Sequence, residues 1–167
     1  MSDEVESGNG RVPVRYHQFD ISDEDGPTGP DLDRGHNGLA RVADGVTIVM
    51  TGIHTGDVDV TVTLHETEPA PDSGNWQDIL EVSAHSASGD LMVRGMMDDL
   101  DEELPILSFH GPGHYRLRVH ARGRDTAIDL TPDQITEWYL IQAWPAPAQA
   151  VRVLRQSEGY GASMRAR

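Results

Sequence analysis

Basic side chains recur at every second position in the segment from Gly113 to Arg124, which reads GHYRLRVHARGR. Successive side chains of a β-strand point to opposite faces, so this spacing predicts a strand with one apolar face and one basic face. The planar guanidinium of arginine binds carboxylates through paired hydrogen bonds. The chemistry that this strand could perform is therefore recognition of acids or polar ligands, carried by Arg116, Arg118, His120 and Arg122.

Two interpretations fit this basic face. In the structural one, acids on neighbouring strands lie opposite the arginines, with Asp57, Asp59 and Glu81 as candidates. Exposed pairs of this kind contribute at most about 1 kcal/mol each. In the functional one, the face docks an acidic partner or binds a small anionic or sugar-like ligand.

A second group of chemically active residues lies in the segment MMDDLDEEL, which contains Asp98, Asp99, Asp101, Glu102 and Glu103. The segment lacks the alternating ligands and central glycine of a helix–loop–helix calcium site. It could be a solvated loop. Alternatively, its carboxylates could take the place of phosphates in the basic groove of an enzyme that acts on nucleic acids.

The eight histidines of the chain raise the question of a metal site, because neutral imidazole suits zinc, nickel and iron. No pair has the His-x-His spacing that places two ligands on the same face of a strand. We therefore expect turn and surface histidines, and a metal site only where loops bring His54, His110 and His114 together. The sequence lacks a Gly-rich phosphate loop, a G-x-S-x-G elbow and a His-Glu-x-x-His motif. No catalytic residue and no cofactor are expected.

Composition narrows the class of protein. With 13 basic and 28 acidic residues, the chain of 167 residues carries a net charge of −15. Such a charge disfavours nucleic acid and anionic membranes as partners and favours a basic protein. The chain has no cysteine and no apolar run approaching the roughly 20 residues that span a membrane. Its acidic start is unlike a signal peptide, so we expect a cytoplasmic protein.

The elements that must position these residues are short strands separated by clusters of Gly, Pro and Asp. This pattern predicts an all-β protein, an antiparallel, jelly-roll-like β-sandwich of about eight or nine strands with little helix. One helical turn is expected at Thr131–Gln134. The expected strands cover residues 11–19, 39–43, 46–51, 57–65, 79–86, 91–95, 105–109, 113–124 and 137–144.

The expected domain organisation has three parts. Residues 1–10 are an acidic extension predicted to be disordered, residues 11–147 form the sandwich, and residues 148–167 form a tail. Pro13 indicates an edge strand because proline cannot donate to a sheet ladder. Open edges could also support a homodimer.

Four short segments resemble landmarks of one known family. They are RYHQF (residues 15–19), ADGVTI (43–48), GHYRL (113–117) and EWYLIQ (137–142). Their order is similar to that of the competence protein J family, the DNA-entry nuclease inhibitors. The resemblance implies a binding protein without catalysis, whose partner is a nuclease.

An inhibitor of a nuclease benefits from carboxylates placed where phosphates would bind, since complementary charge speeds encounter. We therefore assign the partner-binding surface to the acidic cluster formed by Asp98, Asp99, Asp101, Glu102 and Glu103, with help from the acidic segment 20–33.

Overall fold

The computed structural model describes residues 4–23, 39–43, 46–95 and 104–156 of the chain. These residues form ten strands and no helix, which confirms the all-β prediction. Nothing in the described part of the chain is a helix long and apolar enough to cross a membrane. The strands are β1 (Glu4–Arg15), β2 (Gln18–Ser22), β3 (Ala40–Ala43), β4 (Val46–Met50), β5 (Thr55–His65), β6 (Asp78–Ser86), β7 (Met92–Arg94), β8 (Gly113–Arg122), β9 (Trp138–Pro145) and β10 (Arg152–Arg155).

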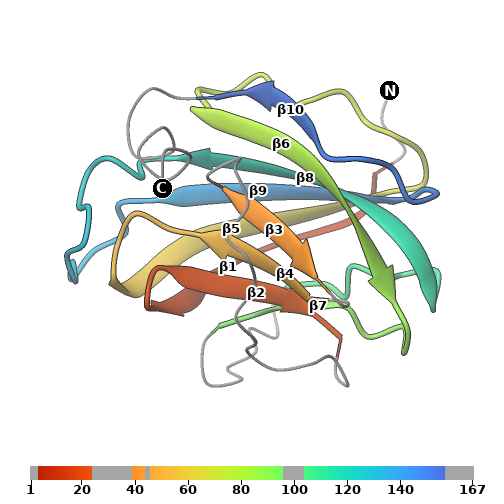
Figure 1. Ribbon diagram of the computed structural model, residues 1–167, viewed down its shortest axis with the longest axis horizontal. Coiled ribbons are helices and arrows are strands. Elements are labelled where there is room, and N and C mark those ends of the chain that lie inside the picture. The colour runs from red at the N-terminus through yellow and green to blue at the C-terminus, as the bar shows by residue number, and fades with distance from the viewer. Residues whose placement is uncertain (1–3, 24–38, 44–45, 96–103, 157–167) are drawn as a thin grey trace.

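The strands form one hydrogen-bonded sheet that bends over onto itself (Figure 1). The order along the sheet is β10-β6-β8-β9-β5-β1-β2-β4-β3, and β7 pairs with β2. The pairing between β5 and β9 is parallel, whereas the other pairs among the described strands are antiparallel. Because of the bend, the limb with β2, β4 and β3 packs against the limb with β6, β8 and β9 around one core.

Alternating strands supply this core as the sequence predicts. On β5, Val58, Val60, Val62 and Leu64 are buried, and on β8 the apolar row is Tyr115, Leu117, Val119 and Ala121. The rings of Phe19 on β2 and Tyr139 on β9 meet edge to face, with centroids 5.2 Å apart, and so join the two limbs. Burial of such side chains is the main favourable term in folding.

Two chain ends are more ordered than the sequence suggests. Residues 4–10, which were expected to be disordered, belong to β1 and pair with Val60–His65 of β5. Residues 152–155 of the expected tail form β10 and pair with β6. Backbone hydrogen bonds to an existing strand need no apolar side chains, so a polar segment can become a strand without showing a hydrophobic pattern.

Two other expected elements do not form. The segment 105–109 is not a strand; Leu107 instead enters the core, and its backbone N–H donates to the carbonyl of Leu91. The segment 131–134 contains no helical turn. There, Pro132 packs against Gly56 at the start of β5.

Two glycines with nearly equal left-handed φ angles test how closely the backbone packs just before β9. Gly111 has a φ of +86° and Gly123 of +88°, but only at Gly123 would a Cβ overlap the carbonyl oxygen of Thr136. We expect Gly111→Ala to cost about 1–2 kcal/mol, the usual penalty of that conformation. Gly123→Ala should cost clearly more, because the start of β9 must also move. Urea unfolding of both variants measures the difference, and equal losses would contradict the close approach.

Candidate functional site

The basic face of β8 is buried beneath a second layer of chain. Arg116, Arg118 and His120 expose only 2%, 1% and 0% of their surface. They lie on the face opposite the core, where the chain segment 69–76 and the carbonyls of residues 149–150 cover them. The sequence pattern therefore predicted the two faces of this strand correctly, but the middle of the basic face is not a surface.

Glu81 is the acid that compensates these arginines. It lies opposite Arg118 in the register of β6 and β8. The Nε of Arg118 donates to Glu81 Oε2 at 2.9 Å, and the Nε of Arg116 donates to Oε1 at 3.3 Å. The predicted pairing is thus confirmed for Glu81. It is not found for Asp57 and Asp59, which lie on β5 beyond β9.

The remaining guanidinium N–H groups meet carboxylate oxygens of Glu81 and Glu68, the hydroxyl of Ser83, and backbone and amide oxygens. Arg118 donates to the carbonyl of Pro69 at 2.7 Å and to the Oε1 of Gln142 at 2.8 Å. Arg116 donates to the carbonyls of Gln149 at 3.1 Å and Ala150 at 2.7 Å. A buried charge is tolerated only when its donors are satisfied, so these contacts hold the covering segments on the sheet.

The segment 69–76 that covers the sheet also keeps His120 in its neutral form. Its Nδ1 lies 3.1 Å from the carbonyl of Leu140, and the backbone N–H of Asp72 donates to its Nε2 over 3.3 Å. This arrangement fits an imidazole with its proton on Nδ1. The pKa of His120 is lowered to about 4, chiefly by burial and also by the nearby charge of Arg118, while the bond to Leu140 acts in the opposite direction.

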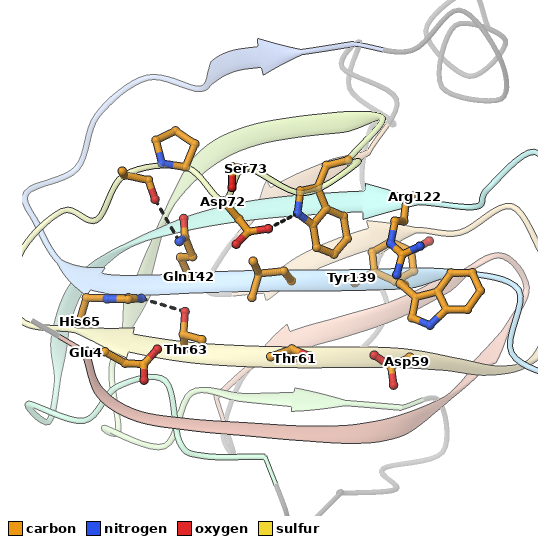
Figure 2. Close-up of a pocket in the computed structure, with 15 residues that line it drawn as sticks. Glu4, Asp59, Thr61, Thr63, His65, Asp72, Ser73, Arg122, Tyr139 and Gln142 are labelled. Atoms are coloured by element: carbon orange, nitrogen blue, oxygen red, sulfur yellow. Dashed lines mark hydrogen bonds between the residues drawn. The ribbon is translucent and has the colours of Figure 1, made fainter. Parts of the chain in front are cut away.

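A groove of about 590 Å³ lies beside the covered arginines, on the same face of the sheet. Its floor is formed by β5 and β9, and its wall by the chain segment 70–76. Figure 2 shows Asp59, Thr61 and Thr63 in a row along β5, with Glu4 and His65 near one end and Arg122 near the other. Its volume falls in the range of small-molecule sites, roughly 300–1,000 Å³.

Two indoles flank the guanidinium of Arg122 at one end of the groove. The guanidinium carbon lies 4.5 Å from the ring centre of Trp138 and 5.6 Å from that of Trp76. The Nε1 of Trp76 donates to Asp72 over 2.7 Å, which fixes this indole and lowers the pKa of Asp72. Within the described chain no carboxylate pairs with Arg122, so its N–H donors remain available.

His65 at the other end of the groove is 3% exposed. Its Nε2 lies 2.8 Å from the hydroxyl of Thr63, whereas its Nδ1 has no hydrogen-bond partner among the described residues. Burial lowers the pKa of His65, and so does the charge of Arg118, against the opposing effect of Glu4. A neutral, incompletely bonded imidazole thus lines this end.

A strained corner occupies the hairpin between β1 and β2. Arg15 pairs with Gln18, so Tyr16 and His17 form a two-residue turn, with φ angles of 54° and 66°. Both residues are left-handed, as a tight hairpin of this kind requires, although glycine or asparagine usually occupies such positions. Asp129, with a φ of 63°, lies 3.0 Å from the Nε2 of His17. These are the three non-glycine residues with positive φ in the described chain, and strain that gathers at one place suggests function.

A buried carboxylate holds the loop that packs against this corner. Glu137 is fully buried and accepts hydrogen bonds from the backbone N–H groups of Gly52 at 3.1 Å and Ile53 at 2.7 Å. The hydroxyl of Tyr139 donates to it over 2.6 Å. Burial raises the pKa of Glu137, although these three donors act in the opposite direction. The loop that Glu137 holds carries His54, whose ring contacts Tyr16 and His17.

The predicted site residues are distributed as follows. The acidic cluster Asp98, Asp99, Asp101, Glu102 and Glu103 lies outside the described residues, as does most of the acidic segment 20–33. Of the proposed ligand face, three residues are buried, and Arg122 lines the groove.

The candidate metal ligands are not brought together. His54 contacts the corner, His110 pairs with Glu66 at 2.8 Å, and the ring of His114 contacts that of His85 at a tilt. Across the described ranges, no three His, Asp or Glu side chains are placed to share a metal ion.

Sequence reasoning missed the groove and the corner. The outward positions of β5 gave a usable signal, since Asp59, Thr61 and Thr63 alternate with buried valines. Trp138 is half-buried and lines the groove. Tyr16 is 69% exposed because the chain turns there.

Comparisons with known proteins show likeness at the level of fold. The structure is similar to the crystal structure of ComJ, inhibitor of the DNA degrading activity of NucA, from Bacillus subtilis. The TM-score is 0.60 at 18% identity, over 87% of this chain and 99% of that chain. It is also similar to a structure described as crocagin biosynthetic gene J, with a TM-score of 0.52 at 15% identity, over 85% and 98% of the two chains.

The fold-level likeness to ComJ confirms the resemblance that the sequence segments predicted, as far as the fold is concerned. No protein-family model matches the sequence, and no curated protein matches it significantly.

The buried neutral His120 should make the fold sensitive to mild acid. Its folded pKa of about 4 lies below its ordinary value of 6.5, so the unfolded chain is protonated first as the pH falls. The contribution of neutral His120 to the free energy of unfolding is fully present above pH 6.5 and is lost as the pH falls toward 4. Between pH 7 and pH 5, this amounts to about 2 kcal/mol.

A His120→Asn variant lacks this titration, and urea unfolding at the two pH values measures the effect. Wild type should lose about 2 kcal/mol more than the variant between pH 7 and pH 5. Glu137 and His65 titrate in both proteins, so their contributions cancel in the comparison. Identical pH dependence of the two proteins would show that His120 is not neutral and buried.

Proposed function

We propose that this protein is a non-catalytic, acidic binding protein that blocks a basic partner nuclease. The observation that carries the proposal is the likeness of fold to the nuclease inhibitor ComJ, which extends over 99% of that chain. The net charge of −15 supports the same role, because a nuclease presents a basic surface to its substrate.

Charge complementarity is the first part of the proposed mechanism. The acidic cluster Asp98, Asp99, Asp101, Glu102 and Glu103 holds five carboxylates within six residues. Carboxylates at this density can occupy the positions at which a nuclease binds successive phosphates. Attraction between such surfaces raises the association rate and decreases as salt is added.

The strained corner is the second part. Tyr16, Leu130 and Ile128 expose 69%, 60% and 40% of their surface, respectively. His54 contacts the ring of Tyr16 and donates its backbone N–H to the carbonyl of Leu130, while Ile128 precedes Asp129 in the chain. Asp129, also in this group, has a side chain that is 68% exposed. Exposed tyrosines on a rigid backbone are typical binding hot spots, because little freedom is lost when they are buried.

A pull-down from native cell extract at low salt tests the proposal. The partner should be a basic protein that elutes as salt is raised, and its DNA cleavage should stop when this protein is added back. A bait that captures no nuclease, or a captured nuclease that cleaves DNA at the same rate in its presence, would refute the proposed role.

Neutralising the acidic cluster should slow binding to the captured nuclease. In a variant with amides at all five positions, we expect the association rate at low salt to fall by more than about tenfold, because steering is lost. Stopped-flow fluorescence at several salt concentrations measures this rate. A control variant neutralises five other carboxylates, at Asp3, Glu6, Asp57, Asp133 and Glu158. An equal effect in both variants would mean that net charge alone, and not the cluster, directs binding.

Truncation of the corner should act on the dissociation rate instead. We expect Tyr16→Ala to weaken binding of the captured nuclease by roughly tenfold or more, mainly through faster dissociation. Val151→Ala is the matched control, since Val151 is 53% exposed and lies outside the corner. Surface plasmon resonance separates the two rates. Unchanged dissociation in Tyr16→Ala would exclude the corner from the interface.

A further inference from the structure

We propose that the groove between β5, β9 and the segment 70–76 is a second binding site, and that its ligand is a neutral saccharide chain. The site shares no residue with the acidic cluster or with the corner. The inference does not depend on the nuclease role, because it rests on the groove residues alone.

The charges in the groove favour a neutral ligand. Glu4, Asp59 and Asp72 supply acids, and Arg122 supplies the positive charge beside the indoles. An anion would meet these three carboxylates and the net charge of −15. A cation would be attracted by these carboxylates but repelled at the indole end by Arg122, which already lies 4.5 Å from the ring centre of Trp138. A ligand without net charge avoids both penalties.

The polar groups of the groove match hydroxyl groups, which both donate and accept hydrogen bonds. The guanidinium of Arg122 offers donors, and Asp59 offers its Oδ2, because its Oδ1 accepts from Asn9 at 3.0 Å. At the other end, the buried Nδ1 of His65 lacks a partner among the described residues. A buried polar atom without a partner costs free energy. A small movement of the imidazole on binding would open this atom to a ligand hydroxyl and remove that cost.

The aromatic walls suit the apolar faces of pyranose rings. A sugar ring presents C–H groups on its faces and hydroxyls around its rim, so it needs flat apolar surfaces next to polar groups. Trp138 and Trp76 line the Arg122 end of the groove, and a sugar ring would stack on the parts of these indoles that the guanidinium of Arg122 leaves open. The bond from Trp76 to Asp72 holds one of these walls in place before the ligand arrives.

The length of the groove indicates a chain of several sugar units. Its floor follows β5 from Asp59 to His65, which at about 3.3 Å per residue corresponds to roughly 20 Å. The polar groups that face the groove are spread along this length (Figure 2). A monosaccharide could reach only one end, whereas an oligosaccharide could contact Arg122 and His65 together.

Titration of the full-length protein with defined oligosaccharides tests the proposal. The probes are cellohexaose, maltohexaose, xylohexaose and chitohexaose, with hexa-arginine and a heparin hexasaccharide as charged alternatives. Tryptophan fluorescence and calorimetry report binding. We expect saturable binding of at least one neutral probe with a dissociation constant in the millimolar range or tighter, and weaker binding of both charged probes. Failure of all four neutral probes to bind, or tighter binding of a charged probe, would overturn the proposal.

Variants locate the binding in the groove. Trp138→Ala and Asp59→Ala should each weaken binding of the responding probe at least tenfold, because one removes a stacking surface and the other an acceptor. Two substitutions are used so that a folding defect in either one, checked by urea unfolding, leaves the other to decide. Tyr16→Ala is the control and should bind the probe as wild type does. Unchanged affinity in a folded groove variant would refute the site. The effect of Tyr16→Ala on nuclease binding is measured separately and does not depend on that result.

Discussion

Burial of a glutamate between two arginines organises the outer layer of this protein. Glu81, Arg116 and Arg118 are each at most 3% exposed, and together they carry one negative and two positive charges. Removing one member of such a group usually costs about 3–5 kcal/mol, because an uncompensated charge remains in a region of low dielectric. The other donors therefore need fixed acceptors, and the carbonyls of Pro69, Gln149 and Ala150 supply them. Segments that would otherwise be loops become a fixed second layer.

This second layer also determines where a ligand can bind. The segment that caps Arg118 continues through Asp72 to Trp76, and there it forms one wall of the groove. The backbone of Asp72 bonds to His120, and its carboxylate bonds to the indole of Trp76. The wall is thus anchored to the buried side chain of His120 and braced by a bond within the segment itself. A site whose walls are fixed before binding loses little freedom on association, which favours even weakly interacting ligands.

The sequence predicted those features that depend on the alternation of apolar and polar residues along a strand. It did not predict the exposure of residues that another segment of the chain covers. The faces of β5 and β8 follow from the spacing of their valines and leucines, because one face of a sheet must pack on a core. Whether Arg116 and Arg118 meet water or another segment depends on carbonyl acceptors, and backbone carbonyls leave no mark in the sequence. For the same reason, residues 4–10 were not recognised as part of a strand. The groove combines residues from β5, β8, β9 and a distant loop, so no local motif could show it.

The position of β9 between β5 and β8 has a consequence for the newly synthesised chain. β9 lies in the middle of the sheet and joins the half formed by β5, β1, β2, β4 and β3 to the half formed by β8, β6 and β10. Until residues 138–145 leave the ribosome, the inner edges of β5 and β8 have no partner. Open strand edges readily pair with other chains. During synthesis, therefore, the nascent protein would be most exposed to aggregation just before its penultimate strand emerges, and a pause in translation ahead of that point would prolong the danger.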